Sequence, residues 1–159
     1  MAVSSETYRQ VLGRFATGVT IITVKNEDGM HGLTVNAFTS LSLDPPLVLI
    51  CIQKNGVSHG YFSGTRSFVV NILNEKQEEL ANRFADTQLN SQQRFQQLSF
   101  QFTRDGIPIL RGTLGHLECR LVNQYDGGDH SIFIGQVENA EVAETGKPLL
   151  FYESQYVHL

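Results

Sequence analysis

Hydroxyl and amide side chains gather just before the most apolar stretch of the sequence. The segment NAFTSLSLDPP (36–46) is rich in such groups and leads into the run LVLICI (47–52). Groups of this kind beside free backbone can hydrogen-bond the edge of a planar heterocycle. They also commonly satisfy their own backbone in a loop, and the local sequence by itself favours this simpler role. The side chains concerned are Asn36, Thr39, Ser40 and Ser42.

A candidate anion site follows the apolar run, in QKNGVSHGYF (53–62). Lys54 supplies positive charge, and the backbone N–H groups of Gly56 to Ser58 can point at a ligand where a short helix begins. This combination suits a phosphate. A Lys-Asn-Gly sequence is also common in solvated turns. A ring-binding loop and an anion site at the two ends of one segment would together suit a mononucleotide.

Two later stretches add an imidazole and two phenols. His130 follows a Gly- and Asp-rich turn and begins a strand-like run. There it can donate to a carboxamide, stack on a ring or transfer a proton. The alternative is a histidine that only holds the start of the strand. Tyr152 and Tyr156 lie in PLLFYESQY (148–156), and such aromatic residues close β-barrels more often than they contact ligands.

Strands are the elements expected to position these groups. Runs of β-branched residues and apolar–polar alternation predict strands in several stretches. Hairpin turns, few helices and no regular strand–helix alternation predict a mainly β protein, a closed or nearly closed antiparallel barrel in one domain over 1–159. The sequence contains no GxGxxG and no GxxxxGK, which excludes a Rossmann turn and a P-loop. The predicted strands are 19–24, 30–35, 47–53, 67–73, 113–122, 131–144 and 149–157.

Helices and one polar excursion complete the expected elements. Apolar residues recur at i, i+3, i+4 and i+7 over 5–15 and predict an amphipathic helix there. Asn74 and Gln77 have the spacing of a capping box and predict a second helix after them. The Gln-rich stretch 86–99 is expected to lie on the surface.

Composition excludes several classes of function. The chain has 159 residues, 41% of them hydrophobic and 18% charged, as in an ordinary globular protein. A net charge of −4 and scattered Lys and Arg argue against binding to nucleic acid or a membrane surface. The histidines lack HExxH or Cys-pair spacing, which argues against a zinc site.

The cellular location is expected to be cytoplasmic. The longest apolar run is too short to span a membrane, and the N-terminus lacks the features of a signal peptide. In that compartment Cys51 and Cys119, which lie in apolar strand-like runs, are expected to be buried, reduced thiols.

Five stretches, in order and with ordinary spacings, resemble the flavin-reductase-like FMN-binding split-barrel family. The resemblance is in particular to the short-chain NAD(P)H:flavin reductase components of two-component flavin-dependent monooxygenases, and it covers nearly the whole chain. It implies a split β-barrel of Greek-key type with a few short flanking α-helices, and a homodimer with flavin near the subunit interface. The stretches are FATGVTIITV (15–24), GLTVNAFTSLSLDPPLVLICI (32–52), FVVNIL (68–73), GDHSIFIGQV (128–137) and PLLFYESQY (148–156).

The resemblance implies NAD(P)H-dependent reduction of FMN or FAD, with the reduced flavin passed to a partner monooxygenase. In this chemistry a hydride moves from nicotinamide C4 to flavin N5, so the protein has to stack two rings and exclude water. This requirement accounts for a sequence without a Ser-His-Asp arrangement or paired carboxylates.

The resemblance also assigns roles to individual residues. The loop at 34–40 would bind the isoalloxazine ring, largely through backbone, and the segment 51–58 would bind the ribityl chain and phosphate. His130 and Tyr152 would contact the nicotinamide nucleotide. The implied flavin-binding residues are Thr34, Asn36, Ala37, Phe38, Thr39, Ser40, Cys51, Ile52, Gln53, Lys54, Ser58 and Phe84.

The C-terminal stretch departs from the family pattern. Many relatives carry a basic residue and a glycine before the final tyrosine, whereas Glu153, Ser154 and Gln155 precede Tyr156 here. The choice between NADH and NADPH therefore stays open, as does the choice between FMN and FAD.

Two other functions are compatible with the same residues. A split-barrel flavoprotein could pass electrons to another acceptor, such as a ferric chelate, and turnover of free flavin with NADH would distinguish it. A non-catalytic flavin-binding barrel could instead regulate another enzyme, and a bound flavin that NADH does not reduce would indicate this role.

Overall fold

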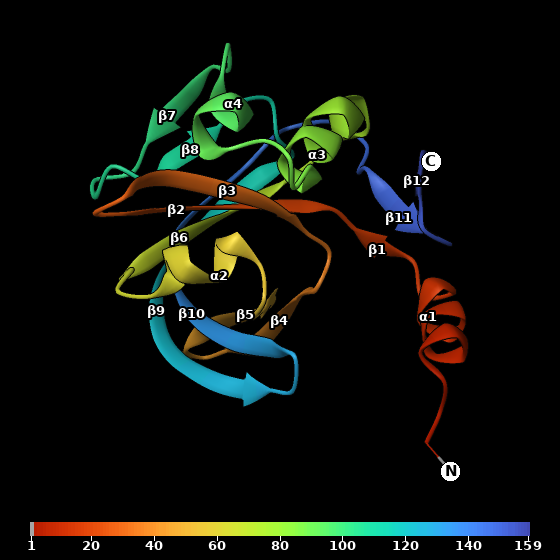
Figure 1. The fold of residues 1–159 in the computed structure, drawn as a ribbon. Coiled ribbons are helices and arrows are strands. Elements are labelled where there is room, and N and C mark those ends of the chain that lie inside the picture. Colours follow the sequence, from red (N-terminus) through yellow and green to blue (C-terminus); the bar gives the residue numbers. More distant parts are fainter. Residues whose placement is uncertain (1) are drawn as a thin grey trace.

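Seven antiparallel strands form the main sheet of the computed structural model, which describes residues 2–159 (Figure 1). Their order is β3-β2-β6-β9-β10-β5-β4. Hairpins join β2 to β3, β4 to β5 and β9 to β10, while β10 pairs with β5 across a long separation in sequence. The bounds are β2 Thr20–Asn26, β3 Gly29–Val35, β4 Phe38–Leu43, β5 Pro46–Gln53, β6 Ser67–Ile72, β9 Gly115–Gly127 and β10 His130–Val142.

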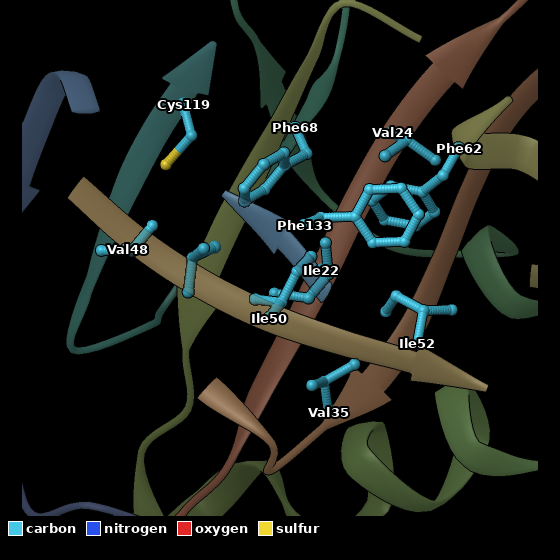
Figure 2. Packing of buried hydrophobic residues seen from close by; sticks show 11 residues of the cluster. Ile22, Val24, Val35, Val48, Ile50, Ile52, Phe62, Phe68, Cys119 and Phe133 are labelled. Carbon is cyan, nitrogen blue, oxygen red and sulfur yellow. The ribbon is translucent and has the colours of Figure 1, made fainter. Parts of the chain in front are cut away.

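The sheet curls around one apolar core (Figure 2). Val35 of β3 and Ile50 of β5 come from opposite parts of the sheet order, yet they belong to the same buried cluster. Helix α2 (Val57–Phe62) contacts β2, β3 and β5 and so lies across the opening between the two parts of the sheet. Its Phe62 packs against Phe133 of β10, with ring centroids 4.8 Å apart. The mainly β barrel predicted from the sequence is confirmed.

A second apolar cluster lies outside the barrel, under helices α3 (Glu78–Ala85) and α4 (Ser91–Phe95). Ile21 of β2 belongs to this cluster, whereas its neighbour Ile22 belongs to the barrel core. Because successive side chains of a strand point to opposite faces, β2 is buried on both sides. This explains its nearly continuous run of β-branched residues.

Short elements surround the barrel. They are α1 (Ser5–Gly13), η1 (Glu75–Gln77), a sheet of β1 (Thr17–Gly18), β11 (Leu150–Tyr152) and β12 (Gln155–Val157), and a pair of β7 (Phe100–Phe102) and β8 (Pro108–Leu110). No helix within residues 2–159 is long and apolar enough to cross a membrane.

The capping box expected at Asn74 and Gln77 is confirmed. The Asn74 side chain accepts from the backbone N–H of Lys76 at 2.8 Å, and the Gln77 side chain accepts from the N–H of Asn74 at 3.0 Å. Ser4 caps α1 by accepting from the N–H of Thr7 at 3.1 Å.

Two sequence predictions differ from the structure. The stretch 149–157 is two short strands instead of one, because Glu153 and Ser154 adopt positive φ values of 48° and 62° and turn the chain. The stretch 86–99 is largely exposed as predicted, but it contains α4, whose Arg94 and Phe95 are buried.

Candidate functional site

A cavity of about 600 Å³ lies between α2, β3 and the segment that runs from α3 to α4. Its size falls in the range of small-molecule sites. It brings together some of the residues expected from the sequence, and these are Thr34, Ile52, Gln53, Ser58 and Phe84. A second hollow, of about 690 Å³, is bordered by Lys25, Arg66 and Asp105 among others and contains none of the expected residues.

A buried histidine bridges two walls of this cavity. His31, on β3, is only 3% exposed, and its Nδ1 lies 2.7 Å from Ser91 Oγ while its Nε2 lies 2.8 Å from Ser58 Oγ. Its ring stacks on Tyr61, with centroids 4.1 Å apart and planes 9° from parallel. Burial, together with the positive charge of Arg94, lowers the pKa of His31 to about 4. The imidazole is therefore neutral near pH 7.

A buried arginine lies on the same wall. Arg94 of α4 is 6% exposed and lines the cavity. Its Nη1 donates to the carbonyl of Gly32 at 2.7 Å and its Nη2 donates to the carbonyl of Asp86 at 2.8 Å, whereas its Nε has no hydrogen-bond partner. Burial lowers the pKa of this guanidinium, while the negative charge of Asp86 opposes that shift.

Lys54 does not line the cavity. Its Nζ pairs with the carboxylate of Asp126 and donates to the carbonyl of Gly128 at 2.6 Å. The hydrogen bond and charge of Lys54 hold the pKa of Asp126 below its ordinary value. Lys54 thus ties the end of β5 to the β9–β10 turn.

His130 begins β10, directly after the turn that Lys54 contacts. It pairs with Gln53 of β5 in the sheet register, and Gln53 does line the cavity. Its Nδ1 lies 2.7 Å from the Asp129 carboxylate, and its side chain is 41% exposed. His130 itself is not among the residues that line the cavity.

The stretch 36–43 also lies outside the cavity lining, and most of it is strand β4 instead of the expected loop. Asn36 and Ala37 are exposed, and the carbonyl of Ala37 accepts from the backbone N–H of Cys51 at 3.0 Å. Thr39 Oγ1 donates to the carbonyl of Ser40 at 3.1 Å, which is the self-satisfying role that the local sequence favoured. Phe38 packs against the barrel core.

The remaining expected residues lie in two places. Thr34 lines the cavity, but its hydroxyl donates to the carbonyl of Ala81 at 2.6 Å and so holds α3 on β3. Tyr152 lies on β11, outside the cavity lining.

The two cysteines are unpaired. Cys119 is buried, and burial raises the pKa of its thiol to about 12. Cys51 is only half-buried, so the expectation of two buried thiols holds for Cys119 alone.

Four residues of the cavity were not expected from the sequence: His31, Tyr61, Ser91 and Arg94. His31 carries no motif, and Arg94 lies in a polar stretch that predicts exposure. His31 lies in a stretch predicted to be a strand, but burial does not alternate along β3, where His31 and Gly32 are both buried, so no local pattern marks it. No pattern in the sequence around Arg94 predicts its burial, because the burial depends on how α4 packs.

The class of this protein follows from its fold together with a match to a known family. The chain belongs to the flavin reductase like domain family, whose sequence model matches residues 12–159. The split-barrel architecture implied by the sequence resemblance is confirmed by this match and by related solved structures.

Individual relatives are similar over nearly the whole chain. FMN reductase (NADH) SmoA of Agrobacterium fabrum is 38% identical over 148 residues, which make up 93% of this chain and 82% of SmoA. HsaB of Mycobacterium tuberculosis, the reductase subunit of a flavin-dependent monooxygenase, is 37% identical over 156 residues, or 97% of this chain and 82% of HsaB. The structure of NADH:FAD oxidoreductase SgcE6 of Streptomyces globisporus, in complex with NAD and FAD fragments, matches with a TM-score of 0.90 at 36% identity, covering 100% of this chain and 96% of SgcE6.

Proposed function

We propose that this protein is an NAD(P)H-dependent flavin reductase that reduces FMN or FAD and supplies the reduced flavin to a partner monooxygenase. The family match over residues 12–159 carries this conclusion. Relatives named as an NADH-dependent FMN reductase and as the reductase subunit of a monooxygenase support the donor, the acceptor and the kind of partner.

The cavity described above fits a flavin. Leu33, Ile52 and Phe84 give it apolar surface, against which a planar ring can pack. Gln53 and Ser58 add hydrogen-bonding groups to the lining, as a ribityl chain and phosphate require. The donor set and the volume of about 600 Å³ are therefore consistent with this ligand.

The bound flavin would supply the redox chemistry, because its N5 accepts the hydride from nicotinamide C4. The chain's own residues bind and orient. The apolar wall excludes water from the rings, and Ser58 offers a hydroxyl to the phosphate. We keep His130 and Tyr152 as contacts of the nicotinamide nucleotide; the position of His130 beside Gln53 supports the first assignment. An unchanged KM for NADH in both His130→Ala and Tyr152→Ala would contradict these assignments.

The function is tested by adding NADH to the purified protein with FMN or FAD under anaerobic conditions. We expect catalytic loss of the oxidised-flavin absorbance, with NADPH as the comparison donor. Electron transfer only to ferric chelates, or a bound flavin that neither donor reduces, would contradict the proposal.

We expect Ser58→Ala to weaken FMN binding by roughly ten- to hundredfold, since a hydrogen bond to a charged group is worth about 1.5–3 kcal/mol. Reduction of flavin in saturated enzyme should change little, because the contact is equal in the ground and transition states. Titration of flavin fluorescence measures the affinity. Lys54→Met is the matched comparison, because its charge pairs with Asp126 outside the cavity. An equal loss of FMN affinity in both variants would mean that the phosphate lies close to Lys54, outside the cavity.

We also propose a homodimer in which α1 contributes to the interface. No residue of α1 is buried, and its apolar residues Tyr8, Val11 and Leu12 recur at i, i+3 and i+4 on one face, while Phe15, expected to continue the stripe, lies just beyond the end of the helix. Such an uncovered apolar stripe commonly marks a protein contact, and twofold homodimers are the commonest assemblies. A flavin near this interface stays part of the proposal. The exposures are 57% for Tyr8, 63% for Val11, 50% for Leu12 and 75% for Phe15.

Leu12→Glu is expected to convert the dimer into monomers at micromolar concentration, because it places a charge in the apolar stripe. Sedimentation velocity measures the change. Gln10→Glu adds the same charge on the other face of α1 and should leave the dimer intact. A wild-type protein that sediments as a monomer under these conditions would contradict the proposal.

A cytoplasmic location is proposed as well, because unpaired Cys51 and Cys119 stay reduced in that compartment. Recovery of the native protein in a membrane or secreted fraction would argue against this location.

A further inference from the structure

Strands β9 and β10 form a long hairpin (Figure 1), and its turn contacts the chain at the end of β5. Residues 123–129, at and before this turn, are exposed, so apolar packing contributes little to holding them in place. The pairing of β10 with β5 begins only at His130. Polar contacts therefore have to fix where the turn lies relative to β5.

Lys54, which directly follows β5, supplies these contacts. Its Nζ pairs with the carboxylate of Asp126 and donates to the carbonyl of Gly128 at 2.6 Å. Its backbone N–H donates to the carbonyl of Asp129 at 2.9 Å. An ammonium group carries three donors on a flexible stem, so one lysine can hold two acceptors of a turn. We call Lys54 and these three contacts the turn clamp.

The clamped turn leads directly into His130. The Asp129 carboxylate lies 2.7 Å from His130 Nδ1, and this hydrogen bond, together with the charges of His130 and Lys54, holds the pKa of Asp129 below its ordinary value. An ionised carboxylate only accepts hydrogen bonds, so Nδ1 carries the proton and Nε2 is left for a ligand. Because Lys54 holds Asp129 and Asp129 holds the imidazole, the turn clamp sets the direction of the ring.

The turn clamp also lies beside the cavity. Gln53 lines the cavity, precedes Lys54 in the sequence and pairs with His130 in the sheet register. A shift of the turn relative to β5 would therefore move His130 relative to the cavity. Helix α2 is held to β10 separately, since His59 Nε2 lies 2.8 Å from Ser131 Oγ. Loss of the turn clamp should thus leave the α2 wall of the cavity in place.

We propose that Lys54 and Asp126 are positioning residues for the nicotinamide nucleotide, because their ion pair fixes the turn that carries His130 to the edge of the cavity. Neither residue touches the flavin or the nucleotide, and both act through His130. This inference rests on the proposed function, in which His130 contacts NADH.

The first test measures reduction of FMN by NADH in Lys54→Met. We expect the KM for NADH to rise by roughly two- to fivefold, the range open to an exposed ion pair, with a smaller change in kcat and with FMN affinity within about twofold of wild type. Lys54→Arg keeps the charge and should restore most of the wild-type KM. An unchanged KM in Lys54→Met, or parallel losses of FMN affinity and KM, would overturn the proposal.

Asp126→Asn separates positioning from electrostatic attraction of the anionic nucleotide. Removal of a negative charge would lower the KM for NADH if attraction were the cause, whereas loss of the ion pair should raise it. Arg120→Met is the matched control, because it breaks another exposed ion pair of the same hairpin, with Glu138 at 2.8 Å, and should leave the KM unchanged. A lower KM in Asp126→Asn, or a rise in Arg120→Met equal to that in Lys54→Met, would contradict the inference.

A double variant tests whether the turn clamp acts through His130. In a His130→Ala background, Lys54→Met should raise the KM for NADH no further, because the side chain that the turn clamp positions is gone. The same fold-change in both backgrounds would show that Lys54 acts by another route, and would contradict the inference. Melting temperatures of all variants, measured alongside, check that the exposed substitutions leave the fold intact.

The two levels of proposal fail in different ways. If NADH reduces no flavin in the presence of wild-type protein, the proposed function is wrong. If reduction proceeds and His130→Ala raises the KM for NADH while Lys54→Met and Asp126→Asn do not, the function stands and the role of the ion pair is wrong. If His130→Ala leaves the KM unchanged, the assignment of His130 and this inference fail together.

Discussion

Replacement of Phe62 by alanine is expected to lower the free energy of unfolding by about 3–5 kcal/mol, the usual cost of truncating a fully buried phenylalanine. Phe62 is 2% exposed and is the residue through which α2 reaches the barrel core. Its ring packs on Phe133 at 4.8 Å and on Phe68 at 6.3 Å between centroids. Both partners belong to strands, so they have little freedom to fill the space that the ring leaves.

Urea unfolding measures this loss, and an unchanged m value would show that two-state behaviour is kept. Val57→Ala is the control on the same helix, because Val57 is 81% exposed and should cost less than about 0.5 kcal/mol. FMN affinity should also fall in Phe62→Ala, since Ser58 and Tyr61 lie on α2 beside Phe62. A loss of stability below about 1 kcal/mol would show that α2 is not held by this contact.

Acidification is expected to remove about 3 kcal/mol of stability through His31 alone. Burial lowers its pKa from the ordinary 6.5 to about 4, and each pH unit of difference corresponds to about 1.4 kcal/mol. Between these two values the unfolded chain binds a proton that the folded protein does not. The contribution is therefore complete above about pH 6.5, decreases as the pH falls, and levels off below about pH 4.

The comparison of wild type with His31→Gln isolates this effect. Carboxylates titrate over part of the same range in both proteins, so the difference between the two stability curves belongs to the histidine. We expect the difference in free energy of unfolding to shrink, or to change sign, as the pH falls from 7 to 4. A difference that stays constant with pH would mean that His31 titrates normally, and that its contacts with Ser58 and Ser91 do not keep it neutral.

Local sequence patterns encode most of the strands and helices and the class of fold. The continuous apolar run 47–52 predicts a buried strand, and in β5 Val48, Ile50 and Ile52 all face the barrel core. The capping box at Asn74 is encoded by residues only three positions apart. Signals of this kind act within a turn of helix or along one strand, so they can be read without knowledge of the rest of the chain. The ordered set of such stretches also sufficed to indicate the family.

Which polar groups share the cavity depends on how distant elements pack together. Lys54 and Ser58 are close in sequence, yet Lys54 turns to Asp126 because the β9–β10 hairpin meets the end of β5. His31 contacts Ser91 across 60 positions, a pairing that depends on α4 packing against β3. Neither residue type nor spacing records such a contact, because it arises from the apolar packing of two distant elements. The burial of Arg94 has the same origin, since Phe95, its neighbour on α4, packs edge-on against Phe84 of α3 and draws the helix onto the sheet.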